Sequence, residues 1–136
     1  MRWQSEKSRK RAREAKPVRQ ALLAKHDLCL VCEHGPRHPW RDKPPACSRL
    51  CVHEIADGKH RQNALDLPCA LLVVCWWCNS ESLKDASEWP EARQLSLMQK
   101  YAPEQYDLAA YNRLVDERAT DRITQAEVDS WTETLP

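Results

Sequence analysis

Four cysteines stand in two pairs whose spacing suits a metal ion. The pairs are Cys29-Leu-Val-Cys32 and Cys75-Trp-Trp-Cys78. Two residues between cysteines allow a tight turn to bring both thiolates to one cation, and two such pairs fill the four positions of tetrahedral Zn²⁺. A closed site has no position for substrate, so we expect a structural Zn²⁺ whose binding energy contributes to folding.

The other three cysteines, Cys47, Cys51 and Cys69, lack this spacing. Cys47 and Cys51 could bind a second metal with His34 or His38, but free cysteine is also a common small apolar residue of protein interiors. An odd count of seven cysteines, with no apolar segment near the N-terminus, favours thiols and metal ligands in a reducing, intracellular compartment over disulfides.

A second set of reactive side chains lies in and beyond the stretch CVHEIADGKHR. His53 and Glu54 are adjacent, His60 and Arg61 follow the glycine, and Asn79 directly follows the second cysteine pair. Imidazole, carboxylate and amide oxygen can bind a divalent ion, imidazole can accept a proton near neutral pH, and arginine can hold a phosphate through two hydrogen bonds. These residues are candidates for a metal-dependent hydrolytic site.

Two predicted strands must position these side chains. Residues 49–55 and 70–75 are rich in aliphatic and β-branched side chains, and the segment ADGKHR after the first of them reads as a turn. Residues 33–46 contain four of the nine prolines and one of the two glycines, which predicts a loop.

A helical pattern follows Asn79. Pro90 begins a predicted helix with an apolar stripe, Pro103 begins a second, and Thr124 with Glu127 forms a capping box that begins a third. Two strands with flanking helices predict an α+β fold.

Charge is unevenly divided although the net charge is only +1. Residues 1–25 hold nine Lys/Arg against two Glu, whereas residues 80–136 hold six Lys/Arg against twelve Asp/Glu. Residues 4–15 are helix-compatible but polar, so we expect that they do not pack against the core. They would form either a solvated tail or a basic arm along a nucleic-acid backbone. Pro17 is expected to begin a second helical segment. The acidic end could contact a protein partner.

No apolar run approaches the length of a membrane span, so no membrane association is expected.

The order CxxC, VHEI, LLVVCWWCN resembles the HNH endonucleases, the ββα-metal or His-Me finger group, in the version with a four-cysteine zinc. The resemblance covers residues 29 to about 83 and implies a small ββα-metal (HNH) core stapled by that zinc. It also implies that His53 and Asn79 hold one Mg²⁺ or Mn²⁺, that DNA is the substrate, and that the protein works in the cytoplasm of a bacterium or phage-infected cell.

Two positions depart from the family pattern. Glu54 stands where the family has its general-base histidine, and Ala70 stands where it has its central asparagine. Either Glu54 is the base, or His53 is the base and Glu54 a metal ligand, with His60 as proton donor or substitute base and Arg61 on the phosphate. Adjacent strand side chains point to opposite faces, so using both at one ion requires a bulge.

The expected organisation has three segments: a basic helical arm at 1–25, a zinc-stapled HNH-like domain at 26–90, and a helical extension at 91–136. The predicted function is hydrolysis of DNA phosphodiester bonds with one divalent ion. Two alternatives stay open: a zinc-containing nucleic-acid-binding module that has lost catalysis, and a zinc-containing interaction protein that uses its acidic helices.

Overall fold

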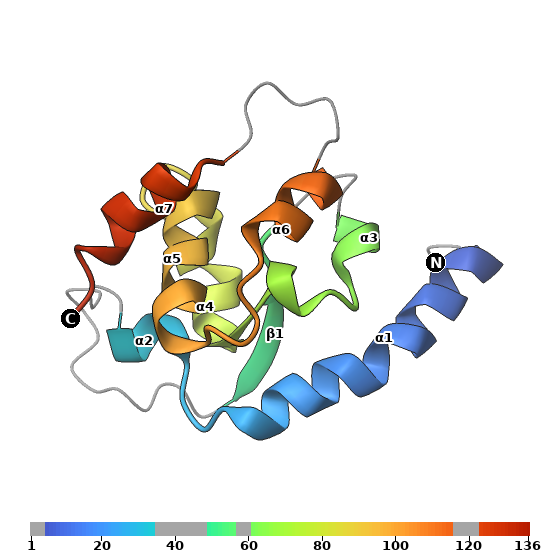
Figure 1. Cartoon of the computed structure of the whole chain (residues 1–136). Coiled ribbons are helices and arrows are strands. Elements are labelled where there is room, and N and C mark those ends of the chain that lie inside the picture. The colour runs from blue at the N-terminus through green and yellow to red at the C-terminus, as the bar shows by residue number, and fades with distance from the viewer. Residues whose placement is uncertain (1–4, 35–48, 57–60, 116–122) are drawn as a thin grey trace.

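Helices surround a two-stranded sheet, and the predicted α+β class is confirmed (Figure 1). The computed structural model describes residues 5–34, 49–56, 61–115 and 123–136. The strands are β1 (Leu50–Glu54) and β2 (Leu71–Cys75). The helices are α1 (Glu6–Lys25), α2 (Leu30–His34), α3 (Arg61–Ala64), α4 (Trp76–Ser80), α5 (Glu91–Tyr101), α6 (Leu108–Val115) and α7 (Gln125–Thr132), with 3-10 turns η3 (Pro68–Ala70) and η4 (Ser82–Lys84).

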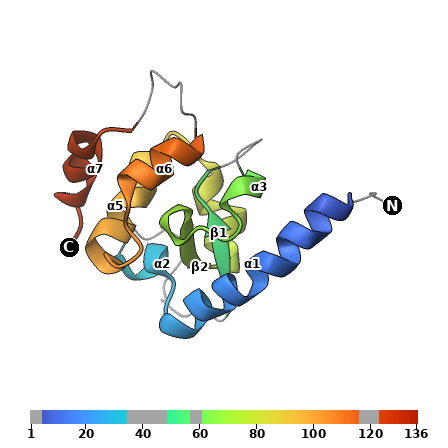
Figure 2. The ribbon, with the colours of Figure 1, turned by 45° about the vertical axis from the view of Figure 1, so that its right-hand side comes forward.

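The sheet is covered on both faces. β1 and β2 pair antiparallel, with Val52 opposite Val73 and His53 opposite Leu72. Since side chains alternate along a strand, Val52 and Val73 share one face, which packs on Leu22 of α1, while Leu72 belongs to the larger core on the other face. Figures 1 and 2 show α1 on one side of the strands and α2 and α5 on the other. This double cover explains why every residue of β2 is buried and why its sequence is a continuous apolar run.

The larger core joins the sheet to the C-terminal helices. The predicted apolar stripe of α5 is buried throughout, and α5 packs against α7 and α2. Tyr111 of α6 and Val128 of α7 are fully buried in the same cluster, which extends from Cys29 to Leu135. The stripe consists of Ala92, Leu95, Met98 and Ala102. The helices after β2 therefore belong to the packing unit that contains the cysteine pairs.

The start of α6 differs from the sequence prediction. Pro103 does not begin a helix: it lies in a turn, and α6 begins at Leu108. The side chain of Asp107 accepts a hydrogen bond from the backbone N–H of Ala110 at 3.0 Å, as a helix-capping residue does. Buried Gln105 donates to two backbone carbonyls in η3 and β2. These long-range bonds hold the turn against the sheet, and the helix begins after it.

The predicted Thr124 cap at the start of α7 is confirmed, and Glu127 of the predicted capping box accepts a hydrogen bond from the Thr124 hydroxyl at 3.2 Å. The Thr124 hydroxyl accepts a hydrogen bond from the backbone N–H of Glu127 at 3.1 Å. Ile123, just outside the helix, packs against the core in which Val128 is buried. The local cap thus fixes the helix whose buried face closes the core beside α5.

The N-terminal helix contradicts two sequence predictions. α1 is one continuous helix with Pro17 inside it, and Ser5 caps its start by accepting a hydrogen bond from the N–H of Ser8. Its first half also packs, since Ala15 is buried. Proline inside a helix removes one backbone hydrogen bond and crowds the preceding turn, at a cost of about 3 kcal/mol. Contacts between α1 and the sheet offset that cost.

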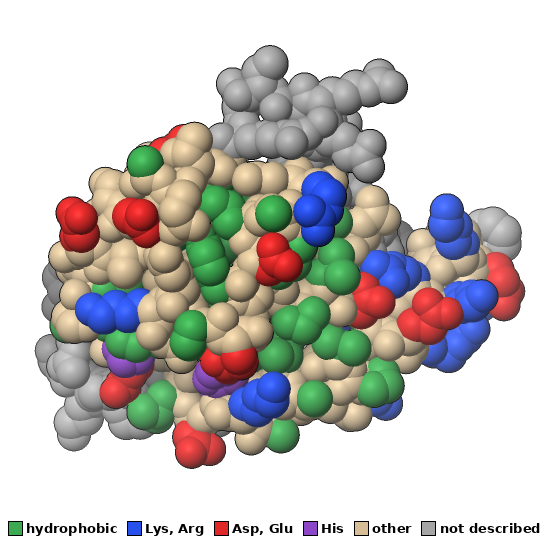
Figure 3. Space-filling model, viewed as in Figure 1, with side chains coloured by type: hydrophobic (Ala, Val, Ile, Leu, Met, Phe, Trp, Pro, Cys, Tyr) green, Lys and Arg blue, Asp and Glu red, His purple; other side chains and the backbone are tan. Residues whose placement is uncertain are grey.

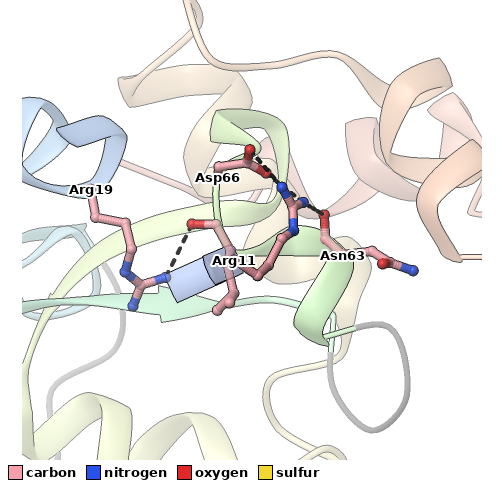
Figure 4. A network of polar contacts seen from close by, with 5 residues as sticks. Arg11, Arg19, Asn63 and Asp66 are labelled. Atoms are coloured by element: carbon pink, nitrogen blue, oxygen red, sulfur yellow. Dashed lines mark hydrogen bonds and ion pairs between the residues drawn. The ribbon is translucent and has the colours of Figure 1, made fainter. Parts of the chain in front are cut away.

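Two arginines fix α1 to the rest of the chain (Figure 4). Arg11 donates to both carboxylate oxygens of Asp66, at 2.8 and 2.6 Å, and to the backbone carbonyl of Asn63 at 2.9 Å. Arg19 donates to the backbone carbonyl of Val52 in β1 at 3.1 Å. Because these two side chains bind protein groups, only part of the basic charge of α1 is available to another molecule.

The remaining charge of α1 is exposed and mixed in sign. Arg9 pairs with Glu6 at 3.3 Å, and Figure 3 shows acidic side chains among the basic ones at the projecting end of the helix. Lys7, Arg13 and Lys16 are also exposed. In the part of the chain that the structure describes, no helix combines the length and apolarity needed to cross a membrane.

Substitution Arg11→Ala tests the docking of α1. We expect a loss of about 1–2 kcal/mol in the free energy of unfolding, because a bidentate, partly buried pair is broken and Asp66 loses its donor. Urea unfolding measures the change. Lys10→Ala is the control, since Lys10 pairs with Glu14 at 3.9 Å in solvent and its loss should stay within about 0.5 kcal/mol. Equal effects of the two substitutions would contradict the docking role.

Candidate metal centre and adjoining cleft

The sulfur atoms of Cys29, Cys32, Cys75 and Cys78 gather at one point. All four lie within 4.8 Å of one another, with Cys32 3.8 Å from Cys75 and 3.5 Å from Cys78. A tetrahedral Zn²⁺ with Zn–S distances of about 2.3 Å separates its sulfur ligands by about 3.8 Å. The donor set and its spacing therefore fit zinc.

Each cysteine pair occupies the start of a short helix. Cys29 precedes α2 and Cys75 is the N-terminal cap of α4. The backbone N–H of Cys32 donates to the sulfur of Cys29 at 3.3 Å, and that of Cys78 donates to the sulfur of Cys75 at 3.5 Å. Backbone N–H groups directed at sulfur stabilise the thiolate form that binds metal.

The pKa values of two thiols in the cluster shift in opposite directions. Hydrogen bonds from the thiol of Cys32, and next from that of Cys78, lower the pKa of Cys29 against the opposing effect of burial. The hydrogen bond to Cys29 raises the pKa of Cys78, and burial and the nearby thiolates raise it further against the opposing effect of the hydrogen bond with Cys32. Four thiolates this close cannot all be charged unless a cation compensates them, so binding of a metal would release protons.

The other cysteines and His34 do not extend the cluster. Burial raises the pKa of both the Cys51 and the Cys69 thiols, so each stays protonated near neutral pH. The ring of His34 stacks on Tyr101, with centroids 3.4 Å apart. Within the described ranges, the four cysteines are the one group of three or more close metal-binding side chains. Cys47 and His38 lie outside the described residues.

His53 and Asn79 are neighbours in space although 26 residues separate them. Nδ1 of His53 lies 2.9 Å from Oδ1 of Asn79. His53 lies on β1, and Asn79 lies on α4 directly after Cys78, so the cysteine cluster and the sheet register together set this contact. The structure therefore brings together the two residues that the sequence predicted as ligands of one divalent ion.

Gln94 of α5 contacts the other nitrogen of the same ring. Its Oε1 lies 2.8 Å from Nε2 of His53, and the side chain is buried. The sequence analysis did not identify Gln94. Its position gave one weak signal: Gln94 lies four residues before Met98 of the predicted apolar stripe, and a glutamine on a buried face requires hydrogen-bond partners.

Glu54 does not join His53. The regular pairing of β1 with β2 leaves no bulge, so the two side chains leave opposite faces of the strand. Glu54 is largely buried on the α1 side, where its Oε1 lies 3.3 Å from Nη1 of Arg19. The carboxylate charge is therefore balanced by an arginine that also binds the backbone of β1.

Two other predicted site residues cannot be placed. His60 lies outside the described residues. Arg61 is the first residue of α3, but its side chain is outside the described part of the structure. Their roles stay predictions.

A cleft of about 680 Å³ opens beside His53 and Asn79. This volume is in the range of small-molecule sites. Its wall carries both charge signs, from Lys84 and Glu91, and Tyr111 donates a hydrogen bond to the carboxylate of Glu91. The lining residues are His53, Glu54, Ile55, Ala56, Asn79, Ser80, Leu83, Lys84, Ala86, Trp89, Pro90, Glu91 and Gln94.

No family model, curated protein or solved structure matches this chain. The resemblance to HNH endonucleases therefore rests on the order of the motifs in the sequence. The cysteine cluster and the contact between His53 and Asn79 are observations on this chain and require no relative.

Elemental analysis tests the cysteine cluster. We expect one Zn²⁺ per chain in protein purified without chelator, and loss of that zinc in Cys78→Ser, because three thiolates and a hydroxyl bind zinc far more weakly than four thiolates. Circular dichroism should show that Cys78→Ser also loses much of its folded structure, since metal binding energy is folding energy.

Cys69→Ser is the matched control. It removes a buried thiol that lies outside the cluster, so its zinc content should equal that of the parent. Parent protein without zinc, or a Cys78→Ser protein that retains it, would show that the cluster is not a zinc site.

Proposed function

We propose that this chain is an HNH-type, metal-dependent endonuclease that hydrolyses phosphodiester bonds in DNA. One observation carries the proposal: Nδ1 of His53 and Oδ1 of Asn79 lie 2.9 Å apart at the wall of an open cleft. The order of motifs in the sequence supports it, because the residues that meet here are those that the resemblance to HNH endonucleases selects as ligands.

The donor atoms suit a divalent cation. An imidazole nitrogen and an amide oxygen bind Mg²⁺ or Mn²⁺ while leaving positions for water and a phosphate oxygen. A bound divalent ion supplies positive charge to the phosphate during hydrolysis. His53 and Asn79 would hold that ion at the cleft, where a DNA backbone could reach it.

The four cysteines have a positioning role in this proposal. Zn²⁺ bound to Cys29, Cys32, Cys75 and Cys78 would join the segment before α2 to the end of β2 and the start of α4. Asn79 is the next residue after the cluster, so a rigid cluster holds Asn79 opposite β1. A fully coordinated zinc takes no part in the chemistry.

Proton transfer requires a group other than His53 and Asn79. Glu54 supports this role poorly, since it faces Arg19 on the opposite side of β1. We therefore assign proton transfer to His60 and phosphate binding to Arg61, whose chemistry suits these tasks.

The surroundings of Glu54 favour a second candidate function. Glu54, which replaces the general-base histidine of the family pattern, is paired with Arg19 at 3.3 Å, and its side chain leaves the face of β1 opposite to that of His53. A scaffold with this substitution could bind DNA without cutting it. The alternative is a zinc-containing nucleic-acid-binding module that has lost catalysis.

Plasmid cleavage distinguishes the two functions. We expect the zinc-loaded parent to nick supercoiled DNA with Mg²⁺ or Mn²⁺ and to stop on addition of EDTA. His53→Ala and Asn79→Ala should each lower the rate by about 100-fold or more, because each removes a ligand of the ion. Gln99→Ala on α5 is the control and should cut as the parent does, since its hydrogen bonds within the described part of the chain go to Asp129 and Thr132 of α7.

Two results of the cleavage experiment would contradict the proposed endonuclease site. Cleavage at the parental rate by folded, zinc-loaded His53→Ala and Asn79→Ala proteins would refute this site. A parent that binds DNA but never cuts with Mg²⁺, Mn²⁺ or Ni²⁺ would establish the non-catalytic module.

The exposed basic residues of α1 predict a salt effect. Replacing Lys7, Arg13 and Lys16 by alanine should weaken DNA binding and reduce the slope of log K against log salt by up to about three, since each phosphate contact contributes a slope of about 0.9. Fluorescence anisotropy with a duplex measures both quantities. Arg113→Ala on α6 is the control and should leave the slope unchanged. An unchanged slope in the triple variant would mean that α1 does not contact DNA.

A further inference from the structure

The side chain of Gln94 forms a bridge between the backbone and the ring of His53. Its Nε2 lies 2.9 Å from the backbone carbonyl of Trp89, and its Oε1 lies 2.8 Å from Nε2 of His53. Gln94 is only 4% exposed, and Trp89 is buried as well. A buried amide with a partner at each end has little freedom to rotate.

The bond to Trp89 determines which end of the amide faces His53. A backbone carbonyl can only accept a hydrogen bond, so the NH₂ group of Gln94 must face Trp89 and its oxygen must face the ring. An amide oxygen also only accepts, and therefore Nε2 of His53 carries the proton in this contact. In a neutral ring the lone pair then lies on Nδ1.

The lone pair on Nδ1 is directed at Asn79. Nδ1 and the amide oxygen of Asn79 are 2.9 Å apart, and both are acceptors in this tautomer. Among the described residues, no other side chain is hydrogen-bonded to the Asn79 amide, so either end of the amide can face Nδ1. The NH₂ group would donate to Nδ1 when no cation is bound, and the oxygen would face the cation when one is bound. Two acceptors at this separation favour a shared cation.

We propose that Gln94 is a positioning residue that fixes His53 with its proton on Nε2 and so presents Nδ1 to the cation shared with Asn79. Metal-binding histidines commonly donate their second N–H to an oxygen that orients the ring and fixes the tautomer. Here a side chain of α5 has that role, which connects the C-terminal helices to the site on β1. The role at the cation rests on the proposed function, whereas the tautomer does not.

Proton-detected ¹⁵N NMR of the zinc-loaded full chain tests the tautomer directly. The parent should show a slowly exchanging proton on Nε2 of His53 and an unprotonated Nδ1. Gln94→Met keeps the size of the side chain but removes the acceptor, so the Nε2 proton should exchange too fast to observe. Gln94→Glu keeps an acceptor for Nε2 of His53, although it loses the donor to the Trp89 carbonyl, and it should restore the signal; Gln99→Met on the same helix should leave the signal unchanged. A proton on Nδ1 in the parent, or a protected Nε2 proton in Gln94→Met, would overturn the proposal.

Mn²⁺ binding, measured by electron paramagnetic resonance, supplies the second readout. Loss of an outer hydrogen-bond partner weakens metal binding by about 10- to 100-fold, and we expect that loss in Gln94→Met but not in Gln99→Met. Equal Mn²⁺ affinity in Gln94→Met and the parent would overturn the role of Gln94 at the cation. A parent that keeps the protected Nε2 proton but binds no Mn²⁺ would refute the proposed function and leave the tautomer assignment standing.

Discussion

The convergence of four cysteine sulfurs is the constraint on which the rest of the site depends. Two strands of five residues each form a sheet too small to be stable alone. The sulfurs lie within 4.8 Å of one another and join the segment before α2 to the end of β2 and the start of α4. Asn79 follows Cys78 directly. A fixed cluster therefore fixes one side of the contact with His53, and the register of the sheet fixes the other.

α1 stabilises the same sheet from the opposite side. Leu22 covers Val52 and Val73, which would otherwise face water, and Arg19 binds the backbone carbonyl of Val52. The basic residues of the first segment thus have two roles that their sequence does not distinguish. Arg11 and Arg19 hold the helix in place, whereas Lys7, Arg13 and Lys16 are exposed to solvent.

Local signals predicted much of this structure, and long-range contacts account for the rest. The CxxC spacing predicted the cluster because each pair closes within one turn, and the capping box predicted the start of α7 for the same reason. The continuity of α1 through Pro17 depends on contacts with β1, and the helix propensities of single residues do not include such long-range contacts. Gln94 was missed because its partners, His53 and Trp89, are brought to it by the packing of α5 and not by sequence distance.

The contacts of His53 also bear on which group accepts the proton during hydrolysis. A general base needs a nitrogen that can reach water, but one nitrogen of this ring faces Gln94 and the other faces Asn79. The ring is thus better arranged as a ligand than as a base. Glu54 could replace it only by leaving Arg19, and strand alternation directs the carboxylate away from the His53 face. The contacts of His53 and the ion pair of Glu54 thus occupy both of these candidate bases. His60 is the remaining acid–base group that the sequence offers near this strand, and for this reason we assign proton transfer to it.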